Sequence, residues 1–236
     1  MQTKQIEIGM GGTGYLGFPM RLFPHFYYWM FKRLFGTRYF DTAALYGFGL
    51  GEKTLGRCPL RVGDKVMTKI GLSSEITTQT PAHLRWGSHF APGQLQRELR
   101  SSLERLSAPS VHALLLHCAD SDYDFGKHVV ALRELKRTGQ TEIIGFSADN
   151  LSQVPKSYPW ADIMQINASM ISSIDPQNCT TLVINSFCRF SLLSNELDAF
   201  RAKYPSIQLV VLVGSSKIWR ITSCVKRLKS VSRIAE

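Results

Sequence analysis

Short apolar runs recur along the chain, and most are followed by a polar or amphipathic stretch. Continuous apolar runs of this length, rich in Val, Ile and Leu, are typical of strands buried on both faces of a parallel sheet. We therefore predict eight strands, at Ile6–Gly9, Arg38–Asp41, Lys65–Ile70, Ala113–His117, Thr141–Ser147, Ile163–Asn167, Thr181–Asn185 and Gln208–Val213.

Helical periodicity is clearest over Pro92–Leu106, where Leu95, Leu99, Leu103 and Leu106 recur on one helix face. Strands that alternate with such helices indicate a parallel sheet, and eight of them in a chain of this length favour a (β/α)8 TIM barrel. No linker divides the sequence, so we expect a single domain over residues 1–236, with an abbreviated C-terminal part. The other predicted helices are Lys127–Arg137, Glu196–Lys203 and Ile218–Leu228.

The composition excludes a disordered chain, because 44% of the residues are hydrophobic and 19% are charged. A net charge of +10 favours polyanionic ligands, but the cations are scattered and no nucleic-acid recognition motif is present, so we expect no nucleic-acid partner. The five cysteines form no C-x-x-C pair and no Cys/His cluster with zinc spacing, so we expect no metal site. Reduced thiols predict a cytoplasmic protein.

An aromatic segment from Leu16 to Phe35 is the sole membrane candidate in the sequence. Pro19, Pro24 and three cations interrupt it, so we expect no integral membrane segment. We also expect no signal peptide, because the first residues lack an apolar core. Packing on the barrel is the ordinary interpretation of the aromatic residues. Contact with a partner protein through residues 18–35, or with a membrane surface, stays an alternative.

Gly9-Met10-Gly11-Gly12-Thr13-Gly14 matches the G-x-G-x-x-G pattern of dinucleotide-binding folds. That fold requires a helix directly after the glycines and an acidic residue about 20 positions later. No Asp or Glu occurs between Glu7 and Asp41. We therefore predict a glycine-rich turn that approaches a ligand, rather than a Rossmann fold.

Polar residues with acid–base chemistry follow three predicted strands. Asp41 ends the second strand and Tyr46 lies in the loop after it, while Lys69 and His117 lie at the ends of the third and fourth. Each residue alone has an ordinary explanation as a surface or packing residue. The C-terminal ends of barrel strands meet at one mouth, so together the four predict a catalytic group.

These four residues match the chemical requirements of carbonyl reduction. It needs a proton at oxygen, and a tyrosine with its usual pKa near 10 donates poorly at neutral pH. We expect Lys69 to lower the pKa of Tyr46, Asp41 to hold Lys69 charged, and His117 to orient the carbonyl oxygen.

These residues resemble the aldo-keto reductase superfamily, whose pattern is a D-T-A-x-x-Y-G stretch, a lysine closing the next strand and a histidine closing the one after. The resemblance runs from about Ile6 to Leu228 and includes Leu132–Gly139 and Ile144-Gly145-Phe146-Ser147. It implies an NADPH-dependent barrel enzyme that reduces an aldehyde or ketone to an alcohol, or catalyses the reverse. The partner is then a small-molecule carbonyl or alcohol, and NADPH (NADP+) is preferred to NADH.

The resemblance also implies the cofactor site. Ser147 and Gln165 match residues that bond the nicotinamide carboxamide, although Ala148 stands where the family has asparagine and Asn150 is a candidate substitute. Phe187 and Phe190 are candidates for stacking on the nicotinamide. The turn Gly214-Ser215-Ser216-Lys217, together with Arg220, resembles the family's phosphate-binding turn; that Lys217 and Arg220 are ordinary surface cations stays open.

The chain departs from the family pattern between Gln165 and Gly214, where it is compressed, and in its short tail after Leu228. We expect an open cofactor cleft. An alternative function follows: a cofactor-binding regulatory or partner-dependent protein with the same fold and little turnover.

Overall fold

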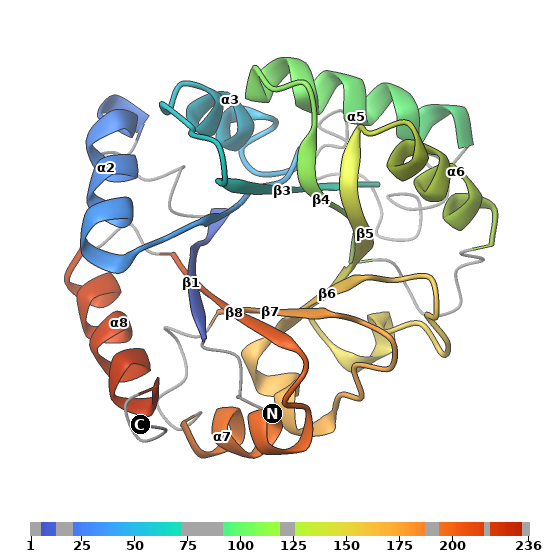
Figure 1. Ribbon diagram of the computed structural model, residues 1–236. Coiled ribbons are helices and arrows are strands. Elements are labelled where there is room, and N and C mark those ends of the chain that lie inside the picture. The colour runs from blue at the N-terminus through green and yellow to red at the C-terminus, as the bar shows by residue number, and fades with distance from the viewer. Residues whose placement is uncertain are drawn as a thin grey trace.

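The computed structural model describes residues 6–12, 21–71, 92–118, 126–186, 194–214 and 218–232. Eight parallel strands pair in chain order, and β8 pairs with β1 to close a barrel. The helices form a ring outside it (Figure 1). The strands are β1 (Glu7–Met10), β2 (Tyr39–Asp41), β3 (Lys65–Ile70), β4 (Val111–His117), β5 (Thr141–Ala148), β6 (Ile163–Asn167), β7 (Thr181–Asn185) and β8 (Gln208–Val213).

The predicted (β/α)8 barrel is therefore confirmed, with strand ends that differ from the predicted ones by up to two residues. The helix predicted over Pro92–Leu106 has those bounds, whereas the last helix continues four residues beyond Leu228. The helices in the described ranges are α2 (Pro24–Phe35), α3 (Leu50–Gly56), α5 (Pro92–Leu106), α6 (Gly126–Arg137), α7 (Ser194–Lys203) and α8 (Ile218–Ser232). Two 3-10 helices, η2 (Leu151–Gln153) and η3 (Ala168–Ser173), follow β5 and β6.

Alternation along each strand produces two cores. On β4, Leu115 points into the barrel and packs with Met67, Val183 and Leu212 in a small inner cluster. Leu114 and Leu116 belong to a larger cluster that includes the buried faces of the helices. The barrel interior is therefore filled, as in other TIM barrels, and the strands can hold side chains at their C-terminal ends in fixed positions.

Helix α2 carries the predicted aromatic segment. Pro24 occupies its first turn, and Gly36 ends it with φ of 64°, where the Gly36 N–H donates to the Lys32 carbonyl. Tyr28 and Phe31 are buried against the barrel, which confirms the predicted packing for this side of the helix. Within the described residues no helix has the length and apolar character to cross a membrane.

The four cysteines that fall in the described ranges, Cys58, Cys118, Cys179 and Cys224, are free thiols. This agrees with the reduced cysteines expected from the sequence.

Candidate active site

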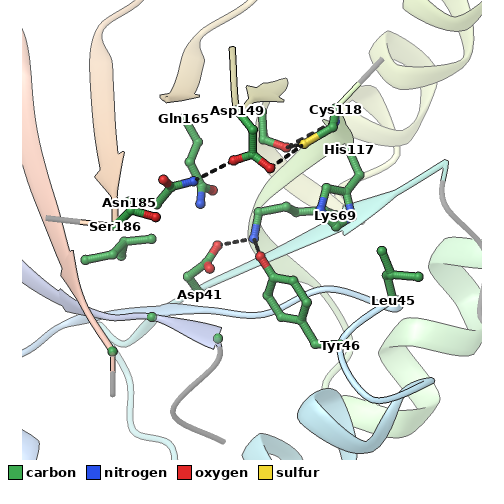
Figure 2. Close-up of a pocket in the computed structure, with 15 residues that line it drawn as sticks. Asp41, Leu45, Tyr46, Lys69, His117, Cys118, Asp149, Gln165, Asn185 and Ser186 are labelled. Atoms are coloured by element: carbon green, nitrogen blue, oxygen red, sulfur yellow. Dashed lines mark hydrogen bonds and ion pairs between the residues drawn. The ribbon is translucent and has the colours of Figure 1, made fainter. Parts of the chain in front are cut away.

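A cavity of about 340 Å³ opens at the C-terminal ends of the strands. Residues from most of the strand ends converge on it, and Figure 2 shows Lys69 near its centre. The described residues that line it are Gly11, Gly12, Asp41, Leu45, Tyr46, Lys69, His117, Cys118, Ser147, Asp149, Gln165, Asn185, Ser186, Leu212 and Gly214.

Lys69 is the most deeply placed charge at this cavity, with 1% of its surface exposed. Its ammonium group contacts a carboxylate oxygen of Asp41 at 2.5 Å and the Tyr46 hydroxyl at 3.2 Å (Figure 2), and it donates to the Thr42 carbonyl at 2.9 Å. Burial alone would lower the pKa of Lys69, but Asp41 and Tyr46 together raise it above its usual value. Lys69 is therefore a fixed cation whose three donors are all used.

The carboxylate of Asp41, the partner of Lys69, is also buried and paired. Burial raises the pKa of its carboxyl group, while Lys69 and hydrogen bonds from the Gly12 backbone and the Gln165 side chain act in the opposite direction. A buried ion pair is tolerated when further hydrogen bonds satisfy the remaining lone pairs, and this pair meets that condition.

Tyr46 reaches the cavity from a tight turn after β2. Its N–H donates to the Ala43 carbonyl, and Gly49, at φ of 83°, turns the chain into α3. The ring also depends on Gly12, because a Cβ at that position would lie 2.2 Å from a ring carbon of Tyr46. The glycine-rich turn after β1 thus makes room for Tyr46 and lines the cavity, whereas the closed barrel rules out a Rossmann fold.

The pKa of Tyr46 differs from the sequence prediction. Burial raises it to about 12, and this effect outweighs the lowering by Lys69. Lys69 does lower the pKa of Tyr46 as predicted, but the prediction that this pKa falls below its usual value is wrong because burial dominates. The positions of the strand ends predicted that Lys69 lies close to Tyr46, but they did not predict how deeply the Tyr46 hydroxyl is buried.

His117 faces Tyr46, with its ring edge-on at a centroid distance of 5.8 Å. The ring is 6% exposed, and its Nδ1 has no hydrogen-bond partner within the described residues. Burial, with a smaller contribution from Lys69, lowers its pKa to about 3. The imidazole is consequently neutral at physiological pH.

The predicted carboxamide residues also line the cavity. Ser147 and Gln165 are neighbours across the β5–β6 pair, and both side chains are buried. The Ser147 hydroxyl lies 3.4 Å from the Leu116 carbonyl, while the Gln165 Oε1 has no partner within the described residues.

Cys118, Asp149 and Asn185 also line the cavity and were not among the predicted site residues. Asp149 accepts from the Asn185 amide at 3.5 Å and from the Cys118 thiol at 3.6 Å. Asp149 and Asn185 lie two positions beyond Ser147 and Val183, so strand alternation could have indicated them. Asn150, the candidate substitute for the missing asparagine, instead caps η2 through Ser152 and does not line the cavity.

The predicted phosphate turn is only partly described. Gly214 lines the cavity at the end of β8, and Arg220 is exposed in the first turn of α8. Ser215, Ser216 and Lys217, together with Phe187 and Phe190, lie outside the described residues.

A model of the aldo/keto reductase family matches residues 32–186, which include the four converging residues and the cavity wall formed by β5 to β7. The chain belongs to the aldo/keto reductase family. Among curated relatives, it is 31% identical to L-galactose dehydrogenase of Arabidopsis thaliana over 117 residues, 48% of this chain and 34% of that protein. It is 30% identical to aldo-keto reductase family 7 member A3 of Homo sapiens over 107 residues, 45% of this chain and 30% of that protein. The chain thus spans about a third of the length of these curated relatives.

Solved structures of this family share the fold. The holo form of aldo-keto reductase AKR11C1 from Bacillus halodurans has a TM-score of 0.68 at 17% identity, and the match covers 100% of this chain and 96% of that one. An aldo-keto reductase from Klebsiella pneumoniae in complex with NADPH has a TM-score of 0.62 at 16% identity, with coverage of 99% and 95%.

Proposed function

We propose that this aldo/keto reductase is an NADPH-dependent oxidoreductase that interconverts a small carbonyl compound and its alcohol, with Tyr46 as the general acid. The observation that carries the proposal is the contact of the buried Lys69 ammonium with both Asp41 and the Tyr46 hydroxyl at the cavity. Named relatives include an L-galactose dehydrogenase and an aflatoxin B1 aldehyde reductase, which supports redox chemistry at CH–OH and C=O groups.

The proton comes from Tyr46. With a pKa of about 12, the phenol keeps its proton at neutral pH, and its transfer to a carbonyl oxygen depends on the Lys69 ammonium beside it. The phenolate that results lies beside the Lys69 ammonium, which stabilises the negative charge as it develops. Asp41 is a positioning residue, since it fixes the Lys69 side chain and does not itself contact the substrate.

His117 orients the substrate. A neutral imidazole has one N–H donor, which can bind the carbonyl oxygen without competing with Tyr46 as an acid. His117 and Tyr46 both line the cavity with ring centroids 5.8 Å apart, so one carbonyl oxygen in the cavity could accept from both side chains.

The polar atoms of the cavity fit a nicotinamide cofactor. The Gln165 Oε1 and the Asn185 Oδ1 are buried acceptors without partners within the described residues, which suits the two amide donors of a carboxamide. Ser147 and Gln165 would hold that group, and the segment from Gly214 to Arg220 would take the phosphates, with Lys217 and Arg220 at the 2′-phosphate. NADPH, when bound, supplies hydride to the carbonyl carbon.

Titration of the purified protein with NADPH and NADH, followed by tryptophan fluorescence, tests the cofactor assignment. We expect tighter binding of NADPH, and a loss of that preference in Arg220→Gln, because a guanidinium pairs with a phosphate through two hydrogen bonds. Equal affinity for the two cofactors in the unchanged protein would contradict the assignment.

A panel of aldehydes and ketones, with NADPH oxidation followed by absorbance, then tests catalysis. Turnover of some panel members supports the reductase. Tight NADPH binding with no turnover across the panel would instead favour the regulatory or partner-dependent alternative.

A further inference from the structure

Large apolar side chains cover the outer side of α2 and the residues just before it. Five of them are 53–60% exposed within a stretch of only thirteen residues. On the outer side of a barrel helix such positions are normally polar, because they face water. We call this set the α2 apolar face: Leu22, Phe23, Phe26, Trp29 and Leu34.

The α2 apolar face is not needed to hold the helix on the barrel. The opposite side of α2 is anchored to Asp64, which accepts hydrogen bonds from Tyr28 and Lys32 at 2.5 Å each. The Tyr28 ring also stacks on Phe40 of β2 at a centroid distance of 5.4 Å. The exposed aromatic residues are therefore additional to the packing that fixes α2.

The surroundings of the face are basic. Arg21, Arg33 and Arg38 are exposed, and the sequence from residue 8 to residue 40 contains no Asp or Glu. Figure 1 places α2 between α3 and α8 in the ring of helices. The chain as a whole carries a net charge of +10.

A groove of about 740 Å³ continues this surface toward α3 and α5. Its cations are Arg21, Lys53, Arg57 and Arg105, and of these Arg105 is paired with the buried Glu52. Glu104 is the acidic residue among its lining groups.

The groove and the apolar face are one surface. Leu22 belongs to both, and an Arg57 guanidinium nitrogen donates to the Arg21 carbonyl at 2.8 Å, which links the C-terminal end of α3 to the segment before α2.

We propose that this surface docks the protein on a membrane that contains anionic phospholipids. Trp29 and Phe26 enter the interfacial layer, and the groove cations Arg21, Lys53 and Arg57 bind the phosphates of lipid headgroups. Aromatic side chains among Arg and Lys, without exposed carboxylates on the helix, are the combination that binds an anionic interface. A second copy of the chain fits less well, because a symmetric contact would bring the same cations against one another.

Cosedimentation with lipid vesicles tests the proposal on the whole chain. We expect binding to phosphatidylcholine vesicles that contain about 30% phosphatidylserine, and little binding to phosphatidylcholine alone. Binding should fall when NaCl is raised to about 0.5 M, because salt at that level screens surface charge over a few ångströms.

Two double variants separate the apolar and the charged contributions. Phe26→Gln with Trp29→Gln should weaken binding to the anionic vesicles at least tenfold, since it removes two inserted rings. Arg21→Gln with Lys53→Gln should weaken it by about fivefold for each cation removed. All four positions are exposed, so circular dichroism and the melting temperature should stay unchanged.

Matched controls lie on α6, on the opposite side of the helix ring (Figure 1). Val130→Gln removes an apolar side chain that is 68% exposed, and Arg133→Gln removes an exposed cation. Both should bind the vesicles as the unchanged protein does.

Three results would overturn the proposal: no binding to anionic vesicles, equal binding to neutral and anionic vesicles, or equal losses in the α2 and α6 variants. Light scattering gives a fourth. The outcome would be that the unchanged protein self-associates and binds no vesicles, while the Phe26 and Trp29 double variant is monomeric. In that case the α2 apolar face is a contact between copies of the chain.

Discussion

At the scale of single residues, the site depends on how Lys69 is buried without loss of its charge. Its ammonium has three acceptors, namely Asp41, the Thr42 carbonyl and the Tyr46 hydroxyl. Removal of a charge from water costs several kcal/mol, so such a group persists only with this degree of pairing. The contacts that stabilise the buried Lys69 ammonium also hold it next to the Tyr46 hydroxyl.

Lys69→Met should therefore destabilise the protein by about 3–5 kcal/mol, because it leaves Asp41 buried without a counter-ion. Urea denaturation measures the change. Lys136→Met is the matched control: its pair with Asp162 is 39% and 28% exposed, and we expect a loss of about 1 kcal/mol or less. Equal losses in the two variants would contradict the account of the buried pair.

His117 should make stability depend on pH in the acid range. In the folded protein its pKa is lowered to about 3, whereas the unfolded chain protonates near 6.5. The unfolded state therefore binds the proton first as pH falls, and stability decreases between about pH 6.5 and pH 3. The slope is at most about 1.4 kcal/mol per pH unit.

The free energy of unfolding, measured by urea denaturation at several pH values for the protein and for His117→Gln, tests this. As pH falls below about 6.5, the unchanged protein should lose stability that His117→Gln does not lose, so the variant becomes relatively more stable. Above about pH 6.5 the difference in unfolding free energy between the two proteins should stay constant. Parallel curves throughout would show that His117 is not kept neutral by the fold.

The sequence predicted the convergence of Asp41, Tyr46, Lys69 and His117, because strand ends of a parallel barrel must meet. It did not predict Asp149 and Asn185: alternation along β5 and β7 could have placed both at the cavity, but their hydrogen bond depends on which side chains meet across β6. Nor did it give the sign of the pKa shift at Tyr46, which is set by burial.

At the scale of elements, the barrel wall near the site depends on close approach of β5 and β6. Gly145 pairs with Ile163, and a Cβ at position 145 would lie 1.7 Å from the Ile163 carbonyl oxygen. No rotamer can relieve a clash with backbone, so a side chain there must separate the two strands that carry Ser147 and Gln165.

Gly145→Ala should consequently destabilise the protein by at least about 2 kcal/mol. Gly93→Ala provides the control, because its added Cβ would have no neighbour closer than 3.8 Å and alanine favours a helix by about 1 kcal/mol. Thermal melts should move down for the first variant and stay level or move up for the second. A Gly145 variant with an unchanged melting temperature would contradict the close packing.

The strands were predictable because each is a buried apolar run with polar residues at its ends. The short 3-10 helices that follow β5 and β6 were not predicted. Asn150 and Asn167 precede them and cap their first residues. Asparagine side chains that accept from the backbone two residues later favour short turns over longer helices. In this chain the result is the 3-10 helices η2 and η3.

At the scale of the whole molecule, closure of the barrel converts separate strand ends into one cavity and separate helices into one outer surface. The net charge of +10 can be counted from the sequence, but only the ring of helices places part of it beside exposed aromatic residues on α2. The proposed cofactor and carbonyl site lies at the mouth of the barrel, and the proposed membrane-binding surface lies on the outer side of α2.

The most direct test of the central claim is NADPH oxidation by Tyr46→Phe with the best carbonyl found for the unchanged protein. Loss of the general acid should lower kcat at least about a hundredfold. The Kd for NADPH, measured by fluorescence, should stay the same, because the hydroxyl is not proposed to bind the cofactor. Turnover by Tyr46→Phe at a rate close to that of the unchanged protein would contradict the assignment of Tyr46 as the acid.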